Sequence, residues 1–215
     1  VILRVLPNPL AIVPEDYRLC DDVENRDGRV EFDLSTKDVE IIGGQPDVGI
    51  LYYASLEDAE EGLLGTELPT LYTNETPNEP IIYDWGTNGV PPAELLCYDI
   101  VALTLRVDPL PDDSATISDE IACQVPFVGI ETIILDDKDA EVLNGQSEDD
   151  FEVYYFEDID DAQSMNLSMA ISSGTPYPYD TNERTIYVGI ENKETNCYIY
   201  YIEDVNTLSL GLDVK

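Results

Sequence analysis

The sequence predicts an all-β protein made of two tandem β-sandwich domains that carry short crossover helices. Three observations favour this fold. The second half repeats the first at a period of about a hundred residues, short runs alternate apolar and polar side chains, and each half has one early and one late cysteine. A chain of 215 residues, 43% of them hydrophobic, is long enough for two packed cores.

The internal repeat is clearest in the stretches "STKDVEIIGGQ" (35–45) and "DDKDAEVLNGQ" (136–146). Five positions are identical: Lys37/Lys138, Asp38/Asp139, Glu40/Glu141, Gly44/Gly145 and Gln45/Gln146. A strand that ends in a proline-rich connection occurs at 1–9 and 102–113, and the same strand recurs at 208–214. We therefore expect residues 1–6 to be the last strand of a preceding repeat, 7–107 the first domain and 108–215 the second.

Alternating or continuous apolar runs predict the strands of both copies. In the first copy they are 28–34, 48–55, 80–85 and 99–107, and in the second 130–135, 151–156, 184–190, 197–203 and 207–214. The connections are rich in Asp, Asn, Gly and Pro, which favours tight turns and antiparallel pairing.

The stretch 35–45 predicts a single helical turn between strands. Ser35 and Asp38 fit a capping box, Val39 and Ile42 an apolar face, and Gly43-Gly44 a left-handed stop. The second copy places Asp136, Asp139, Ala140, Leu143 and Asn144-Gly145 at the same positions. The stretch 55–62 repeats the device. The repeated stretch, 35–45 and 136–146, contains no plausible nucleophile or base, so we interpret the repeat as structural.

Charge and composition exclude several classes of function. Ten basic and 46 acidic residues give a net charge of −36, which repels nucleic acid and anionic membranes and attracts cations. The chain has no histidine, so it lacks the usual general base and the usual zinc ligand. No run of eighteen apolar residues predicts membrane insertion. We expect no enzyme, and the acidity alone also fits a solvated surface adapted to salt.

The four cysteines, Cys20, Cys97, Cys123 and Cys197, are duplicated in register. The early and late cysteines are 77 positions apart in the first copy and 74 in the second. This spacing predicts one disulfide within each domain, which stabilises by about 4–5 kcal/mol in the chain-entropy account. Disulfides indicate an oxidising compartment, and the alternative is four reduced core cysteines.

Two acidic groups are candidate Ca²⁺ sites, because this cation takes oxygen ligands. One is the turn "DDVENRDG", with Asp21, Asp22, Asn25 and Asp27, and the other is the junction, with Asp108, Asp112 and Asp113. The turn does not fit an EF-hand, since Val23 stands where that loop needs its first carboxylate. An ordinary hairpin turn and a plain linker are the alternatives.

The first copy resembles a known family through "YRLCDDVENRDGRVEFDLSTKDVEIIGGQ", "ILYYASLEDAEEG", "LYTNETP", "CYD" and "RVDPLP". It is similar to repeat modules of very large secreted surface proteins of Bacteroidota, especially Flavobacteriia, which resemble gliding adhesins and leave the cell by type IX secretion. The resemblance implies an immunoglobulin-like, stalk-forming module at the cell surface. Asp113-Ser114-Ala115 is similar to the O-glycosylation signal of that lineage, which makes Ser114 a candidate glycosylation site. The second copy departs from the pattern after Cys123.

These observations predict a secreted, non-catalytic repeat of an extracellular adhesin or surface filament, stiffened by cations. Its expected partners are neighbouring copies of the repeat, joined in one polypeptide or by strand exchange between chains. Surface glycans are a further expected partner. The alternative is a carbohydrate-binding accessory module of a secreted polysaccharide-degrading enzyme, in which Trp85 and the tyrosines stack sugars. Specific sugar binding on a glycan array, or a fused hydrolase domain, favours that alternative.

Overall fold

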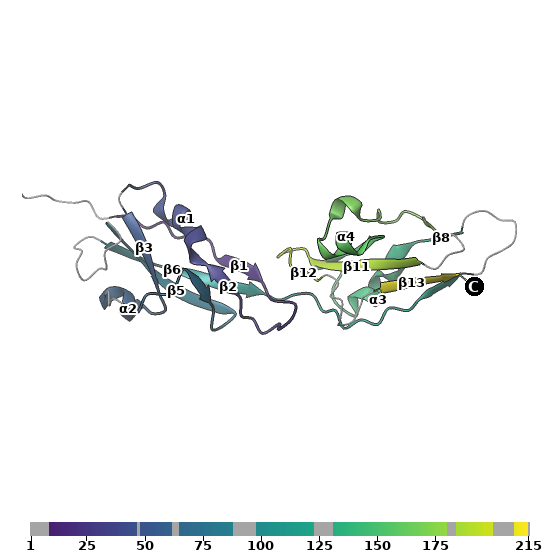
Figure 1. Cartoon of the computed structure of the whole chain (residues 1–215), viewed down its shortest axis with the longest axis horizontal. Helices are drawn as coiled ribbons and strands as arrows, with labels where there is room; N and C mark the ends of the chain where they lie inside the picture. The colour runs from purple at the N-terminus through teal and green to yellow at the C-terminus, as the bar shows by residue number, and fades with distance from the viewer. Residues whose placement is uncertain are drawn as a thin grey trace, which may run out of the picture. The chain divides into compact units, whose positions relative to one another are not determined.

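The computed structural model describes residues 9–46, 48–61, 65–87, 98–122, 131–179, 184–199 and 209–214 (Figure 1). The chain divides into two units, Val1–Pro109 and Leu110–Lys215, so the division falls two residues after the expected boundary. The expected extra strand at 1–6 lies outside the described residues. Both units are mostly β-sheet with a few short helices, as the sequence predicted.

Unit 1 contains two sheets and two helices. Its elements are β1 (Tyr17–Cys20), β2 (Glu31–Asp33), α1 (Asp38–Ile42), β3 (Val48–Tyr53), α2 (Leu56–Glu61), β4 (Leu71–Thr73), β5 (Asn78–Thr87) and β6 (Tyr98–Asp108). Four strands form a sheet in the order β1-β6-β5-β3, and β2 pairs with β4. All these pairs are antiparallel except β1 with β6, which run parallel.

The core of unit 1 lies between its two sheets. Alternation along β6 turns Leu103, Leu105 and Val107 inward, where they meet Phe32 of β2. The Tyr17 ring of β1 contacts the Phe32 ring edge-on, with centroids 5.0 Å apart. One apolar cluster therefore joins the two sheets.

The expected capping box at Ser35 is wrong in detail. A 3₁₀ turn, Leu34–Lys37, precedes α1, and Asp33 caps this turn by accepting from the Ser35 backbone N–H at 3.1 Å. The extra turn changes the phase of α1, so Ile41 is buried while Val39 is 81% exposed. The expected left-handed stops are confirmed at Gly43 (φ 57°) and Asn144 (φ 49°).

A buried tyrosine fastens each short helix to the sheet. The Tyr52 hydroxyl of β3 donates to the Asp38 carboxylate at 2.8 Å and lies 3.0 Å from the Leu34 carbonyl oxygen. In unit 2 the Tyr155 hydroxyl donates to Asp139 at 2.8 Å. Burial raises the pKa of Asp38 and of Asp139, against the opposing effect of the tyrosine hydrogen bond. Both tyrosine pKa values are raised, first by burial and then by the carboxylate.

Unit 2 repeats this arrangement with shorter strands. Its elements are β7 (Glu120–Ala122), β8 (Glu131–Ile133), α3 (Asp139–Leu143), β9 (Phe151–Phe156), α4 (Ile159–Gln163), β10 (Tyr177–Tyr179), β11 (Arg184–Asn192), β12 (Tyr198–Ile199) and β13 (Ser209–Val214). Two 3₁₀ turns, Leu135–Lys138 and Leu167–Met169, accompany them. Strand β11 pairs with β9, β12 and β13, β13 pairs with β7, and β8 pairs with β10. None of the described helices is long or apolar enough to cross a membrane.

The two units differ in their last strand. In unit 1, β6 is one strand of eleven residues that pairs with β5 along nine positions without a break. In unit 2, β12 and β13 take its place along β11, with residues 200–208 outside the described part. As in unit 1, the last strand pairs in parallel with the first, β13 with β7.

Removing the Tyr52 hydroxyl should weaken unit 1. Tyr52→Phe leaves the half-buried Asp38 carboxylate without its donor, which should lower the free energy of unfolding by about 1.5–3 kcal/mol. The measurement is urea denaturation at neutral pH. Tyr98→Phe is the matched control, because Tyr98 is exposed and the same change there should cost less than about 0.5 kcal/mol. Equal losses in the two variants would contradict the role of this hydrogen bond.

Asp38 should make stability depend on pH in a definite direction. Its pKa is raised on folding, so the native state holds this proton more tightly than the unfolded chain does. Its contribution to stability is present below the unfolded value of 3.8 and is lost as pH rises through the folded pKa. The unfolding free energy of Asp38→Asn relative to wild type should therefore rise with pH above about 4. Urea titrations from pH 3.5 to 7 measure it, and a difference that falls with pH would contradict the assignment.

Candidate functional site

The candidate site of this protein is formed by the two ends of each unit, because the described cysteines, Cys20 and Cys197, lie at such ends. We call the end at which the last strand begins the head end, and the end at which it finishes the tail end. In unit 1 these are the Tyr98 and Asp108 ends of β6, and in unit 2 the β12 and Val214 ends. The chain leaves unit 1 at its tail end through Asp108-Pro109.

The tail end of unit 1 is organised around Cys20 and Asp108, which are paired across β1 and β6. The Arg18 guanidinium donates two bonds of 2.8 Å to the Asp108 carboxylate, which is 7% exposed. The Asp21 backbone N–H donates to the Asp108 carbonyl oxygen at 2.9 Å. A bidentate ion pair with one buried partner fixes the side chains on either side of it, so β1 and the start of the linker are held together.

The acidic turn after Cys20 satisfies its own backbone. The Asp21 carboxylate accepts from the Gly28 N–H at 3.0 Å and the Asp22 N–H at 2.9 Å, and Asp27 accepts from Arg29 N–H at 3.0 Å. No group of three or more acidic or cysteine side chains suited to a metal ion occurs in the described ranges. The Ca²⁺ site expected at Asp21, Asp22, Asn25 and Asp27 stays a prediction.

Asn74 is the hub that holds this turn to the sheet. Its side chain is fully buried, accepts from Val30 N–H at 2.7 Å and donates to the Gly28 and Thr76 carbonyl oxygens at 2.7 and 2.8 Å. Every polar atom of the side chain therefore has a partner. Sequence reasoning missed this role, although "YTN" recurs as "DTN" at 180–182, a stretch outside the described residues.

The junction acids lie in different surroundings. Asp108 is buried in its pair with Arg18, whereas the exposed Asp112 carboxylate accepts from the Ser114 N–H at 3.0 Å and hydroxyl at 2.8 Å. The Ser114 hydroxyl also accepts from the Asn144 side chain at 3.2 Å. Asp112 N–H donates to the Gln146 side chain at 2.8 Å, which ties the start of unit 2 to the loop after α3. Neither the junction cation nor glycosylation at Ser114 is tested by these contacts.

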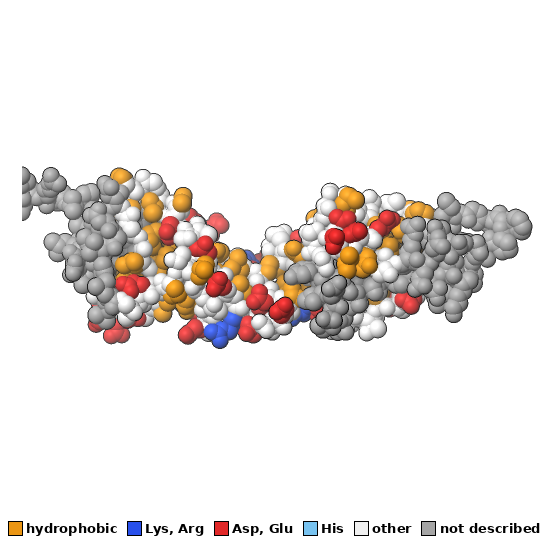
Figure 2. All heavy atoms as spheres, viewed as in Figure 1, with side chains coloured by type: hydrophobic (Ala, Val, Ile, Leu, Met, Phe, Trp, Pro, Cys, Tyr) orange, Lys and Arg blue, Asp and Glu red, His pale blue; other side chains and the backbone are white. Residues whose placement is uncertain are grey.

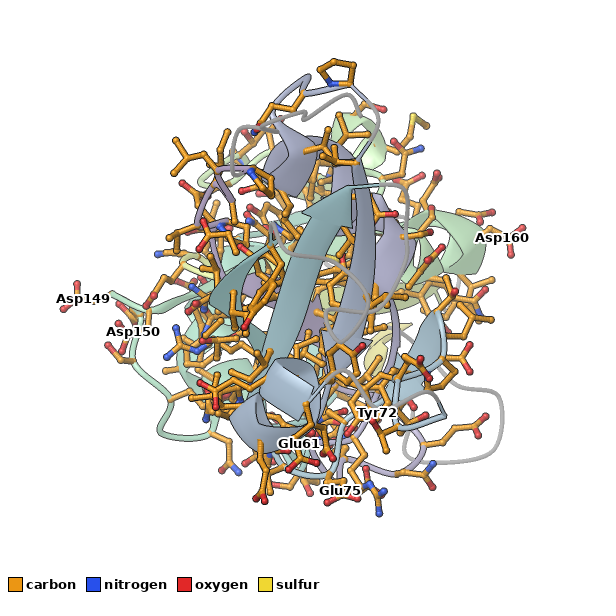
Figure 3. All side chains as sticks on the ribbon, turned by 90° about the vertical axis from the view of Figure 1, so that its left-hand side faces the viewer. Glu61, Tyr72, Glu75, Asp149, Asp150 and Asp160 are labelled. Carbon is orange, nitrogen blue, oxygen red and sulfur yellow. The ribbon has the colours of Figure 1, made fainter. Side chains whose placement is uncertain are left out.

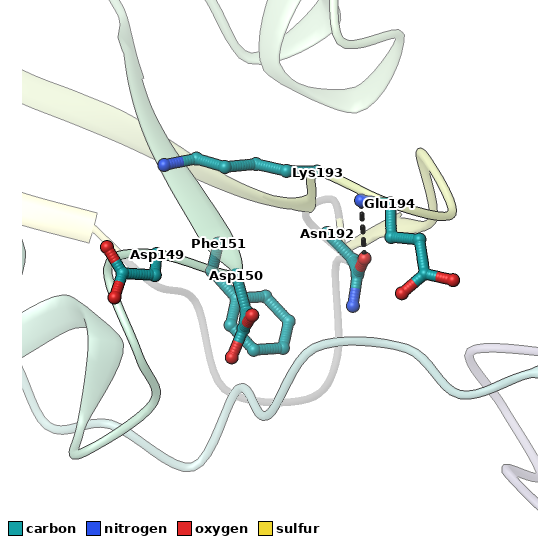
Figure 4. A pocket seen from close by; sticks show the side chains of 6 residues that line it. All are labelled: Asp149, Asp150, Phe151, Asn192, Lys193 and Glu194. Carbon is teal, nitrogen blue, oxygen red and sulfur yellow. Dashed lines mark hydrogen bonds between the residues drawn. The ribbon is translucent and has the colours of Figure 1, made fainter.

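The head end of unit 2 carries Cys197. Its carbonyl oxygen accepts from Asn192 N–H at 2.8 Å, and Lys193 N–H donates to the Asp150 carbonyl oxygen at 2.9 Å. These two bonds hold the end of β11 next to Cys197 and next to the start of β9. Between them lies an open hollow lined by Asp149, Asp150, Phe151, Asn192, Lys193 and Glu194 (Figure 4). Gln146, which binds the first residues of unit 2, lies just before this loop, so the chain enters unit 2 at the head end.

Acidic side chains are scattered over the visible described surface, and they outnumber the few basic ones (Figure 2). Several project freely into solvent, as Glu61, Glu75 and Asp160 do in Figure 3. Others are held at lysines: Glu40 accepts from Lys37 at 2.9 Å, and Glu141 lies 3.4 Å from Lys138. The Lys37 hydrogen bond lowers the pKa of Glu40, and hydrogen bonds from Ser118 lower that of Glu141.

Cys20 and Cys197 are both disulfide-bonded, while Cys97 and Cys123 lie outside the described residues. The expected bond between Cys20 and Cys97 stays a prediction, because Cys97 lies outside the described residues. Cys20 lies opposite Asp108, whereas the described strand β6 begins ten positions away, at Tyr98. Ten steps of extended chain span about 33 Å, and a disulfide needs Cα atoms within about 7 Å.

The described strands of unit 2 separate the two ends of its sheet in the same way. Cys123 follows Ala122, which pairs with Val214 at the tail end, and nearby Leu212 pairs with Arg184 at the start of β11. Cys197 is hydrogen-bonded to Asn192 at the other end of β11. The eight steps between Arg184 and Asn192 alone span about 27 Å. The repeated spacing was therefore a correct signal of a repeated unit, and the expected pairing within each unit stays a prediction.

These features define a disulfide-bearing β-module present in two copies. The chain matches the model of the Flavobacterium inter-domain disulphide bond domain twice, over residues 16–111 and 119–210. The two matches cover most of the chain, which belongs to this family. No curated protein matches the chain. The match supports the expected likeness to a flavobacterial repeat module.

Truncating Asn74 should strongly destabilise unit 1, although the residue lies in the polar stretch "YTNETP" (72–77). Asn74→Ala removes the partner of the Gly28 and Thr76 carbonyl oxygens and of the Val30 N–H, so the unfolding free energy should fall by about 2–4 kcal/mol. Thermal denaturation measures this loss. Asn166→Ala in unit 2 is the control, since its half-buried side chain makes fewer such bonds. A loss at Asn74 no larger than at Asn166 would show that the hub is dispensable.

Proposed function

We propose that this chain is a non-catalytic structural repeat of an extracellular adhesin or surface filament, in which a disulfide between Cys20 and Cys197 links consecutive units. The observation that carries the proposal concerns the two described cysteines, which are both disulfide-bonded. Cys20 lies at the end of unit 1 where the chain leaves it, and Cys197 lies at the end of unit 2 where the chain enters it. The family's description, an inter-domain disulphide bond, supports the same pairing.

The choice of partner follows from chain connectivity. The chain leaves unit 1 at the end that carries Cys20 and enters unit 2 at the end that carries Cys197. The residues between, from Asp108 to Asp112, form a short proline-containing connection. Cys20 thus lies at the end of unit 1 where the linker begins, and Cys197 lies at the end of unit 2 where the linker finishes. Both cysteines are disulfide-bonded. The early cysteine of one unit would bond the late cysteine of the next.

This bond would give each junction two covalent connections, the main chain and the disulfide. A crosslink between positions 20 and 197 closes a loop of 177 residues, which stabilises by about 5 kcal/mol in the chain-entropy account. Two connections at one junction also restrict bending more than a single peptide linker does. A stiff, repeated module suits a stalk or filament better than it suits a catalyst.

The fold and the charge are consistent with this role. A sheet in which the last strand pairs in parallel with the first, facing a second sheet through one core, supports the immunoglobulin-like sandwich implied by the sequence resemblance. The disulfide indicates an oxidising, extracellular location. With a net charge of −36, side-by-side packing of filaments would need cations such as Ca²⁺ for screening, and neighbouring copies of the repeat are the proposed partners.

Disulfide mapping tests the proposed pairing. Free thiols of the oxidised chain are alkylated, and the protein is digested and analysed by mass spectrometry without reductant. The expected result is one crosslinked peptide pair that contains Cys20 and Cys197, with Cys97 and Cys123 alkylated. A crosslink between Cys20 and Cys97 would overturn the proposal.

Single serine variants sharpen the result. Cys20→Ser should release Cys197 as a free thiol, and Cys197→Ser should release Cys20. Cys97→Ser is the matched control, because it removes a cysteine from the same unit as Cys20 and should leave the crosslink intact. Loss of the crosslink in this control would show that Cys97 is itself one of the bonded cysteines.

A further inference from the structure

Helix α4 lies on the face of the five-stranded sheet of unit 2 that points away from the core of that unit. Side chains alternate along β9 and β11, so Tyr155 and Val188 belong to the core, whereas Phe156 and Gly189 face the other way. Phe156 and Ala162 of α4 are also buried, at 0% and 1% exposure, where α4 packs on both strands (Figure 1). The contact between α4 and the sheet is therefore a second, smaller packing region inside unit 2.

Met165 stands at a backbone position that glycine usually takes. Helix α4 ends in a Schellman motif, in which Asn166 N–H donates to the Asp161 carbonyl oxygen at 2.9 Å and Met165 N–H donates to the Ala162 carbonyl oxygen at 3.2 Å. The residue after the cap of such a helix is left-handed, and Met165 has a φ of 45°. A side chain is disfavoured in this conformation, so a methionine here needs a contact that compensates.

Gly189 provides the space for that contact. It lies inside β11, where glycine weakens a strand and marks a place that another group approaches closely. A Cβ atom added at Gly189 would lie 2.5 Å from the Met165 sulfur and 3.5 Å from the Phe156 ring, so a side chain there would displace the sulfur. Two departures from local preference, a methionine in the left-handed region and a glycine in a strand, thus serve one contact.

A thioether in this place is chemically vulnerable. Met165 is only half-buried, so a small oxidant such as hydrogen peroxide reaches it. The O–O bond of the peroxide breaks, one oxygen atom bonds to the sulfur, the sulfur loses two electrons, and water leaves. The sulfoxide is larger and polar, and it would have to remain against the Gly189 backbone and the buried Phe156 ring.

We propose that Met165 is a reversible oxidation site, which holds α4 on the sheet as a thioether and releases it as a sulfoxide. Release would expose Phe156 and loosen the segment after α4, in which Ile171 N–H donates to the Tyr155 carbonyl oxygen of β9 at 2.8 Å. The contact lies within unit 2, so the proposal does not depend on how the cysteines are paired.

The chain contains an internal control. Its second methionine, Met169, is 59% exposed and lies four positions after Met165. Susceptibility follows exposure, so Met169 should be oxidised first. Because most of its side chain lies in solvent, its sulfoxide should leave α4 in place.

The test follows both methionines in the full chain. Free thiols are alkylated, hydrogen peroxide is added, and mass spectrometry gives the oxidised fraction of each methionine and the hydrogen exchange of peptides that cover 159–171. Oxidation of Met169 should leave exchange unchanged, whereas oxidation of Met165 should raise the exchange rates of the α4 amides about tenfold or more. It should also lower the melting temperature of unit 2 by about 5–10 °C. Methionine sulfoxide reductases should reverse both effects.

Three variants isolate the contact. Met165→Leu keeps the volume of the side chain and should remove the response to peroxide, whatever its own starting stability. Met169→Leu is the matched control and should keep the full response. Gly189→Ala should displace the sulfur toward solvent and speed the oxidation of Met165 about threefold or more, with the rate at Met169 unchanged.

Three results would overturn the proposal. One is Met165 sulfoxide with unchanged exchange in α4, and another is an equal response to peroxide in wild type and Met165→Leu. The third is a Met165 that stays reduced after Met169 is fully oxidised. None of them bears on the proposed disulfide, so the two proposals fail separately.

Discussion

The length of one strand is the constraint on which the account depends. Strand β6 holds Tyr98 and Asp108 about 33 Å apart, and its parallel partner β1 places Cys20 at the Asp108 end. The inward side chains of β6 and its unbroken pairing with β5 keep it straight enough for this purpose. This separation of the two ends of β6 is the reason for the proposal that Cys20 bonds a cysteine of a neighbouring unit.

Polar side chains fix the loops at the ends of the sheets, where apolar packing is thin. Asn74 and Asp21 hold the turn after Cys20, Arg18 holds Asp108, and Tyr52 fastens α1. Carboxylates such as Asp21, Asp27 and Asp33 accept from backbone N–H groups, so part of the large acidic content has a local structural use. Other acidic side chains remain at the surface, where mutual repulsion opposes compaction. The proposed disulfide between units would oppose that repulsion.

The sequence predicted the two-unit β-protein and most long strands, because alternation and the internal repeat report directly on burial. Strands β9 and β11 begin at the predicted residues, and the left-handed stops at Gly43 and Asn144 were recognisable from residue type. It missed short strands such as β4, which have too few residues for a pattern. It misassigned the cap, because Asp33 acts through a 3₁₀ turn that leaves no signature in spacing. The position of Cys20 beside Asp108 depends on the parallel register of β1 and β6, which no local pattern reveals.

Single-molecule stretching between the chain ends tests the central claim most directly. If Cys20 and Cys197 are bonded, full unfolding leaves 177 residues locked, and reduction should release about 600 Å of additional contour length. Cys20→Ser alone should release the same length as full reduction, because one bond holds the whole segment. Bonds within each unit would instead lock 77 and 74 residues separately. In that case Cys20→Ser would release only about half of the length gained on reduction, and the account would be contradicted.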